Sequence, residues 1–289
     1  NRYLIKAYDL EEDLSPKVPL SEISLRCNPH HRYSRSKSGE DLEARLLSDT
    51  LKEFISYAVG CMMGRYSLDK LGLIIASQNL SPRHYFKMVS SSQFTPCEDG
   101  IICCTSKNWL DNELSDRFKL FLKQTFGSIH FEENLSFIEH SIHPKKNRRT
   151  SIENYCLKSF YKDHCRMYKK RPIYWMFSSK KGHFKAFIYL HRYTPNTPKL
   201  IMDNHLTPLK IKLLDTATNL KKRMTQVQNK KTELKRSLKE LNSLNDVLED
   251  LKDFEERILN PLIISPPQID LDDGVVVNGE HFGAAFSIG

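Results

Sequence analysis

The strongest constraint on the fold is the apolar periodicity of residues 206–259. Apolar side chains recur there at steps of three and four, which is the spacing of a coiled coil. The repeating positions are Leu206, Leu209, Leu213, Ala217, Leu220, Met224 and Val227, followed by Leu234, Leu238, Leu241, Leu244, Leu248, Leu251, Phe254 and Ile258. One continuous helix would be a rod of about 80 Å. The polar, basic residues 228–232 are an alternative turn between two antiparallel helices, and the residues alone leave both readings open.

Shorter helices are predicted on the N-terminal side of this segment. A period near 3.6 residues over 42–63 predicts one long helix that faces a core, with Ser38 and Asp41 as its start signal. One-sided apolar positions over 111–126 predict a second helix, which Gly127 would end. Residues 131–138 predict a third.

Strand signals are fewer and shorter. The apolar runs at 71–77 and 101–105 suit buried strands, and residues 173–177 and 184–193 suit a β-hairpin around the loop 178–182. Residues 272–277 have a turn-and-strand pattern. The expected fold class is therefore α+β: mostly helical, with a small mixed or antiparallel β module and a long helical, coiled-coil-like hairpin.

Function is indicated most clearly by a dense positive charge between residues 145 and 185. Thirteen lysines and arginines stand there against Glu153 and Asp163, a local net charge of +11 in a chain whose total is +9. Eleven aromatic rings are interleaved with these charges or follow them up to Tyr193. Clustered cations with flat aromatic faces suit a polyanion such as nucleic acid.

A helix is expected to carry the first part of this charge. Thr150 and Glu153 form a capping box, and Pro172 must end the helix. One face would be apolar, and the opposite face would be a basic stripe. The predicted phosphate contacts of this stripe and of the residues just after it are Lys158, Lys162, Arg166, Lys169, Lys170 and Arg171.

The β-hairpin is expected to add a second group of contacts. Lys180, Lys181 and Lys185 lie at or near its tip, where they would reach a groove of the nucleic acid or its rim. Tyr174 is a candidate for stacking as much as for the core. For the other large rings, core packing is the expectation: Trp175, Phe177, Phe184 and Phe187.

The bulk composition is ordinary for a soluble chain, with 39% apolar and 27% charged residues. The seven cysteines are odd in number and form no C-x-x-C, which favours a reducing cytosol. Cys156, His164 and Cys165 are poorly spaced for zinc, so we expect no metal site. The sequence has no apolar run long enough to span a membrane and no signal peptide, so we expect no membrane contact. It begins without methionine, so we expect a fragment of a longer polypeptide.

Motifs for catalysis and cofactor binding do not occur in this sequence. It has no P-loop and no dinucleotide-binding glycine pattern. Ser265-Pro266-Pro267-Gln268 resembles the loop of amino-methyltransferases, but Gln268 replaces the ring that would stack on a flipped base. We therefore expect no catalytic residue and no cofactor-binding residue in this chain.

Four collinear blocks carry a family resemblance: FISYAVGCMMGRYSLDK at 54–70, LSDRFKLFLKQTFG at 114–127, FYKDHCRMYKKRPIYWMFSSKKGHFKAFIYLHRYTP at 160–195 and IDLDDGVVVN at 269–278. They resemble the C-terminal half of the PglX family, the adenine-specific DNA methyltransferases of BREX phage-defence systems. The resemblance implies an upstream catalytic domain that binds S-adenosylmethionine. It also favours the helical hairpin over the rod.

The resemblance implies that this chain is the target-recognition and spacer portion of a site-specific adenine-N6 methyltransferase. Residues 1–70 would connect to the missing domain, 71–200 would recognise duplex DNA, 201–260 would be the helical spacer, and 261–289 a C-terminal tail. A competing hypothesis is a protein-interaction module that docks other defence subunits or a phage inhibitor. A weaker one is binding of RNA or single strands.

Overall fold

A computed structural model describes residues 1–33, 38–78, 80–143, 149–226 and 231–283. Three cations of the basic stretch, Lys145, Lys146 and Arg148, lie outside the described residues, as does most of the turn predicted at 228–232. The chain divides into two compact units, residues 1–54 with 136–150, and residues 55–135 with 151–289. None of the described helices is long and apolar enough to cross a membrane.

The first unit is helical. Its elements are α1 (Arg2–Ala7), a 3-10 turn (Leu20–Glu22), α2 (Pro29–Arg32), the first part of α3 (Gly39–Met63) and the last part of α6 (Phe131–Ser141). The start signal of α3 is confirmed, because the hydroxyl of Ser38 accepts a hydrogen bond from the backbone of Asp41 at 3.2 Å. The hydroxyl of Ser48 donates to the carbonyl of Ile142, which ties the two segments of this unit together.

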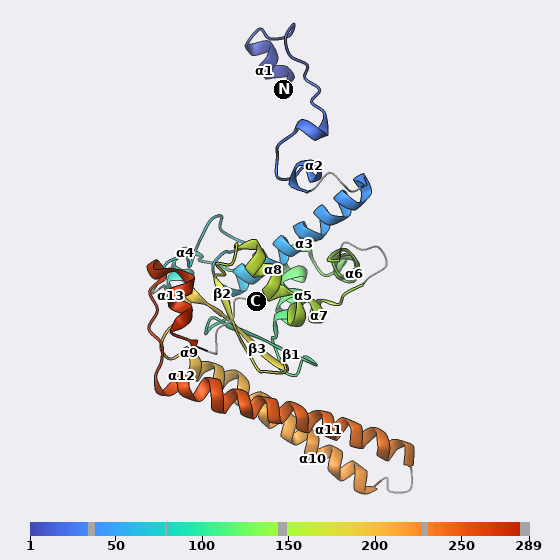
Figure 1. The fold of residues 1–289 in the computed structure, drawn as a ribbon, viewed down its shortest axis with the longest axis vertical. Helices are drawn as coiled ribbons and strands as arrows, with labels where there is room; N and C mark the ends of the chain where they lie inside the picture. Colours follow the sequence, from blue (N-terminus) through green and yellow to red (C-terminus); the bar gives the residue numbers. More distant parts are fainter. Residues whose placement is uncertain (34–37, 79, 144–148, 227–230, 284–289) are drawn as a thin grey trace. The chain divides into compact units, whose positions relative to one another are not determined.

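A three-stranded antiparallel sheet lies at the centre of the second unit (Figure 1). Its strands are β1 (Ile101–Thr105), β2 (Tyr174–Ser178) and β3 (Phe184–Tyr189), in the order β1-β3-β2. Ile101 is opposite Ile188, and Tyr174 is opposite Tyr189. The predicted β-hairpin and the strand at 101–105 are thus confirmed.

Helices cover both faces of this sheet, which explains why its strands are mostly apolar rather than alternating. On one face, side chains such as Trp175 and Phe184 share a core with Leu209 and Leu213 of α10 (Thr207–Gln226). On the other face, β1 contacts α5 (Leu114–Phe126) and α7 (Ile152–Lys158). The ring of Phe160 at the start of α8 (Phe160–Met167) meets that of Phe187 at 5.4 Å on this second face.

The long apolar repeat forms a helical hairpin, not a rod. Helix α10 packs against α11 (Lys231–Phe254), and Leu220 of the first helix shares a core with Leu244 and Val247 of the second. Figure 1 shows the two helices side by side on one face of the sheet. A π-helical segment lies at the sheet-proximal end of each, Ile201–Leu206 before α10 and Glu255–Leu259 after α11.

Two strand predictions are wrong. Residues 71–77 are irregular, because the backbone amides of Ile74 and Ile75 donate to the loop after α3, at Arg65 and Gly64, and not to the sheet. Ile75 is nevertheless fully buried. The apolar run therefore correctly indicated burial, but the hydrogen-bond partners of its backbone decide its conformation.

The C-terminal tail is also helical where a strand was predicted. The helices of this unit not yet given are α4 (Pro82–Met88), α12 (Asn260–Ile264) and α13 (Gly274–Glu280). Helix α13 is the last of them in the chain and contains the three consecutive valines. The side-chain amide of Asn278 donates to the carbonyl of Gly274 at 2.9 Å. The side chain of Asp270 accepts from the backbone N–H of Asp272. These side-chain bonds favour a turn and a short helix over the β propensity of valine.

Candidate nucleic-acid interface

The basic stripe lies on two short helices instead of one. The cap is Ser151, one residue after the predicted Thr150, and its hydroxyl accepts from the backbone of Asn154 at 3.3 Å. The backbone leaves the helical region at Ser159, where φ is −122°, and α8 then begins at Phe160. The break separates Lys158 from the other cations of the stripe.

Four of the predicted phosphate ligands line one surface hollow of about 340 Å³. They are Lys162, Arg166, Lys169 and Lys170, with Cys165 between them, and we call this site the cationic hollow. All four cationic side chains are exposed. Arg166 forms an ion pair with Asp163 at 3.1 Å. The other three cations still make the hollow strongly positive. A spacing of four residues on α8 brings Lys162 and Arg166 together, and the turn after the helix adds Lys169 and Lys170.

The two lysines after α8 have a strained backbone. Lys169 has φ of 50° and Lys170 φ of 63°, so both are in the left-handed region that favours glycine. The conformation ends the helix, because the amide of Lys170 donates to the carbonyl of Cys165 at 2.8 Å. Each such residue other than glycine costs about 1–2 kcal/mol. Two consecutive lysines thus occupy backbone positions that glycine would adopt with less strain.

We predict that Lys169→Gly stabilises the chain by about 1 kcal/mol, because glycine removes the steric strain but adds unfolded-state entropy. The same change should weaken duplex DNA binding about fivefold through the loss of one phosphate contact. Thermal unfolding and fluorescence anisotropy measure the two effects. Lys169→Ala is the matched variant, since it removes the charge and retains the strain. Equal DNA affinity of all three proteins would contradict a role for this lysine.

The β-hairpin tip does not present its cations freely. The ammonium of Lys181 pairs with Asp246 of α11 at 2.5 Å, and the backbone of Lys181 donates to the buried carboxylate of Asp250. Lys185 donates to the carbonyl of Leu157 at 2.7 Å, and burial lowers its pKa. Lys180 is exposed. The hairpin is thus tied to α11 and α7: Lys180 and Lys181 both lie at the surface, but Lys181 is held in the ion pair with Asp246.

Tyr174 is wrong as a stacking candidate, because its ring is 0% exposed. It stacks on His164 at 4.7 Å, and the backbone amide of Tyr174 donates to Nε2 of that histidine at 3.2 Å. The core packing expected for Trp175, Phe177, Phe184 and Phe187 is confirmed, since each is at most 1% exposed. The rings of the basic stretch are therefore mainly the core beneath its charges.

His164 gives the chain a predicted sensitivity to acid. Burial lowers the pKa of His164 to about 3, so the folded state holds this imidazole neutral. An unfolded chain would protonate it below a pKa of about 6.5, and stability is therefore lost as the pH falls from that value. At pH 5 the loss should be about 2 kcal/mol. We expect His164→Gln, which keeps an acceptor for Tyr174, to flatten the dependence of unfolding free energy on pH. An unchanged pH profile would contradict this.

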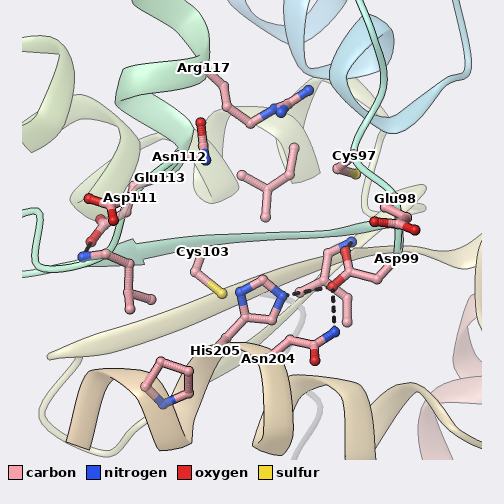
Figure 2. A pocket seen from close by; sticks show the side chains of 14 residues that line it. Cys97, Glu98, Asp99, Cys103, Asp111, Asn112, Glu113, Arg117, Asn204 and His205 are labelled. Atoms are coloured by element: carbon pink, nitrogen blue, oxygen red, sulfur yellow. Dashed lines mark hydrogen bonds and ion pairs between the residues drawn. The ribbon is translucent and has the colours of Figure 1, made fainter. Parts of the chain in front are cut away.

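A second cavity, of about 430 Å³, lies between β1, the start of α5 and the π-helical segment before α10 (Figure 2). His205 and Asn204 both hydrogen-bond Asp99 there, at 2.9 and 3.5 Å. Burial alone would raise the pKa of Asp99, but the hydrogen bond and charge of His205 hold it below its usual range. On α5, burial lowers the pKa of Arg117, whose Nη2 donates to the carbonyl of Thr95.

Acidic side chains dominate this second cavity. Its lining carboxylates are Glu98, Asp99, Asp111 and Glu113. Glu113 is buried and accepts from Thr105 and Leu110, and burial raises its pKa. A negative lining repels phosphates, so we do not count this cavity among the candidate phosphate contacts. Residues far apart in sequence form it, and neither spacing nor composition could have revealed it.

Metal coordination finds no support among the described residues. Groups of three or more His, Cys, Asp or Glu side chains that could hold a metal ion do not occur in this part of the chain. Cys156, His164 and Cys165 are all buried, and burial raises the pKa of the Cys156 thiol. Pro267 of the Ser265-Pro266-Pro267 segment is structural, because its carbonyl accepts from the hydroxyl of Tyr193 at 3.0 Å.

Two curated relatives match nearly the whole chain. An adenine-specific methyltransferase BrxX of Escherichia coli O9:H4 (strain HS) is 36% identical over 290 residues, which cover 95% of this chain and 24% of that protein. An adenine-specific methyltransferase PglX of Lacticaseibacillus casei (strain Zhang) is 34% identical over 283 residues, or 96% of this chain and 22% of that protein. The resemblance to PglX is confirmed, and the chain spans about a quarter of the length of these relatives. No protein-family model matches the chain.

Proposed function

We propose that this chain is the DNA-contacting portion of a site-specific adenine-N6 DNA methyltransferase that acts in bacterial phage defence. In this proposal the catalytic domain, with its S-adenosylmethionine, belongs to another part of the protein, and the chain holds duplex DNA in the cytoplasm. The observation that carries the proposal is the cationic hollow, where four exposed cations converge, two of them on a strained backbone. The names of the relatives supply the reaction.

The chain would act by positioning. Lys162, Arg166, Lys169 and Lys170 would contact successive phosphates, which fixes the register of the duplex without reading its sequence. Lys158, which precedes α8 in the sequence, and Arg171, which follows Lys170, are exposed and would extend the same contact. Lys180 would reach the rim of the groove. The buried core of rings and the ties of Lys181 and Lys185 hold these contacts in a fixed arrangement.

Competition binding tests the proposal. The 289-residue chain should bind a labelled duplex, and an unlabelled duplex should compete better than a single strand of the same length. Preferential competition by the single strand would favour the RNA or single-strand alternative and contradict the proposal.

Charge variants separate the proposal from the protein-interaction alternative. In that alternative, changes in the cationic hollow leave DNA binding unaltered and instead abolish co-purification with other defence subunits or an inhibitor. Loss of the protein partner with intact DNA binding would therefore replace the proposed function.

A further inference from the structure

The two halves of the helical hairpin differ in charge. In the half next to the sheet, cations form ion pairs with nearby carboxylates. Lys210 pairs with Glu255, and Arg257 pairs with Asp253. The distal half has seven exposed cations and, among its described residues, only Glu233 and Glu240 as acids. We call these cations the distal basic arm: Lys221, Lys222, Arg223, Lys231, Lys235, Arg236 and Lys239.

The distal basic arm is costly for the helices that carry it. Lys231, Lys235 and Lys239 of α11 follow each other at steps of four, so like charges repel along one face by about 0.2–0.5 kcal/mol per pair. Lys231 is also the first residue of α11, where the helix dipole favours an acidic side chain. In the described part of the chain, none of the seven cations forms an ion pair with a described carboxylate, whereas Lys210, Lys252 and Arg257 of the proximal half each do.

We infer that the distal basic arm is a second contact for the phosphate backbone of duplex DNA, separate from the cationic hollow. Charge complementarity selects this partner, since a polyanion neutralises the cations that it contacts and removes their repulsion. Helix α10 has 20 residues and is therefore about 30 Å long. That length is close to one turn of duplex, so the distal cations lie far from the sheet, and we place their contact on DNA beyond the segment that the hollow holds. The inference rests on the proposed function for the identity of the polyanion.

Two duplex lengths and matched triple variants test this inference on the 289-residue chain. The arm variant is Lys231→Gln, Lys235→Gln and Lys239→Gln, and its control in the proximal half is Lys212→Gln, Lys252→Gln and Arg257→Gln. With a duplex of about 30 base pairs, the arm variant should bind on the order of 100-fold more weakly than wild type, and its salt slope should fall by about 2.7. With about 10 base pairs, one turn of duplex, it should bind like wild type. The control should match wild type on both, and circular dichroism checks that all variants are folded.

The outcomes separate the two claims. An arm variant that binds the long duplex as wild type does, while changes in the cationic hollow abolish binding, overturns the arm contact and leaves the proposed function in place. A weakened arm variant together with unaffected hollow variants supports the arm and contradicts the hollow. Failure of the wild-type chain to bind either duplex overturns both.

Discussion

Changing Lys162, Arg166 and Lys170 together to glutamate is expected to lower the affinity of the chain for duplex DNA by on the order of 100-fold at 0.15 M salt. Each phosphate contact releases counterions and contributes about a fivefold gain in affinity at that salt, and the introduced carboxylates add repulsion. The three side chains are exposed, so the substitutions should leave the core intact. Anisotropy with a short duplex measures the loss.

A matched control separates this local effect from a change in net charge. Arg83, Lys87 and Lys199 are also exposed cations of the second unit, and they lie outside the cationic hollow. Their joint change to glutamate alters the net charge by the same amount. We expect a small loss of affinity for this control. Equal losses in the two triple variants would show that only overall charge matters, which contradicts a defined site.

The second large effect is expected for folding. Asp250 of α11 is 3% exposed and accepts from the hydroxyl of Ser179 at 2.6 Å and from the backbone of Lys181 at 2.9 Å. The same hydroxyl accepts from the backbone of Phe184, so one carboxylate organises the whole β-hairpin loop. Asp250→Ala should lower the free energy of unfolding by about 3 kcal/mol, because two charge-assisted hydrogen bonds vanish and leave buried donors without partners.

Asp246→Ala is the control for this prediction. Asp246 lies one turn earlier on α11 and pairs with Lys181, but its side chain is half exposed. Water can replace that ion pair, so its loss should change stability little. Chemical denaturation of both variants measures the difference. Similar losses in the two would show that Asp250 has no special role in the loop.

Periodicity and capping predicted much of the fold from the sequence. The span of α5 was predicted closely, and its C-terminal Gly127 has the expected positive φ of 81°. The apolar repeat over residues 206–259 could not decide between a continuous rod and a helical hairpin, because both arrangements bury the same leucines. The break at Ser159 also has no marker, since serine is common inside helices as well as at their ends.

The candidate site was predictable in its composition and not in its geometry. The spacing of Lys162 and Arg166 predicted a shared face, which α8 confirms. The left-handed backbone of Lys169 and Lys170 could not be predicted, because lysine gives no sign of that conformation. The partners that hold Lys181 and Lys185 come from α11 and α7, and sequence distance concealed them. The burial of Tyr174 could not be predicted either, because an aromatic ring beside cations is equally compatible with packing in a core and with stacking on a nucleobase.

The salt dependence of DNA binding tests the central claim most directly, because its slope counts the phosphates that the chain contacts. The wild-type chain on a short duplex should give a log–log slope of about −5, as six phosphate contacts predict. The variant with Lys162, Arg166 and Lys170 changed to glutamate should give a slope of about −2.5. A flat dependence for the wild-type chain, or the same slope for both proteins, would contradict the cationic hollow as the site that holds DNA.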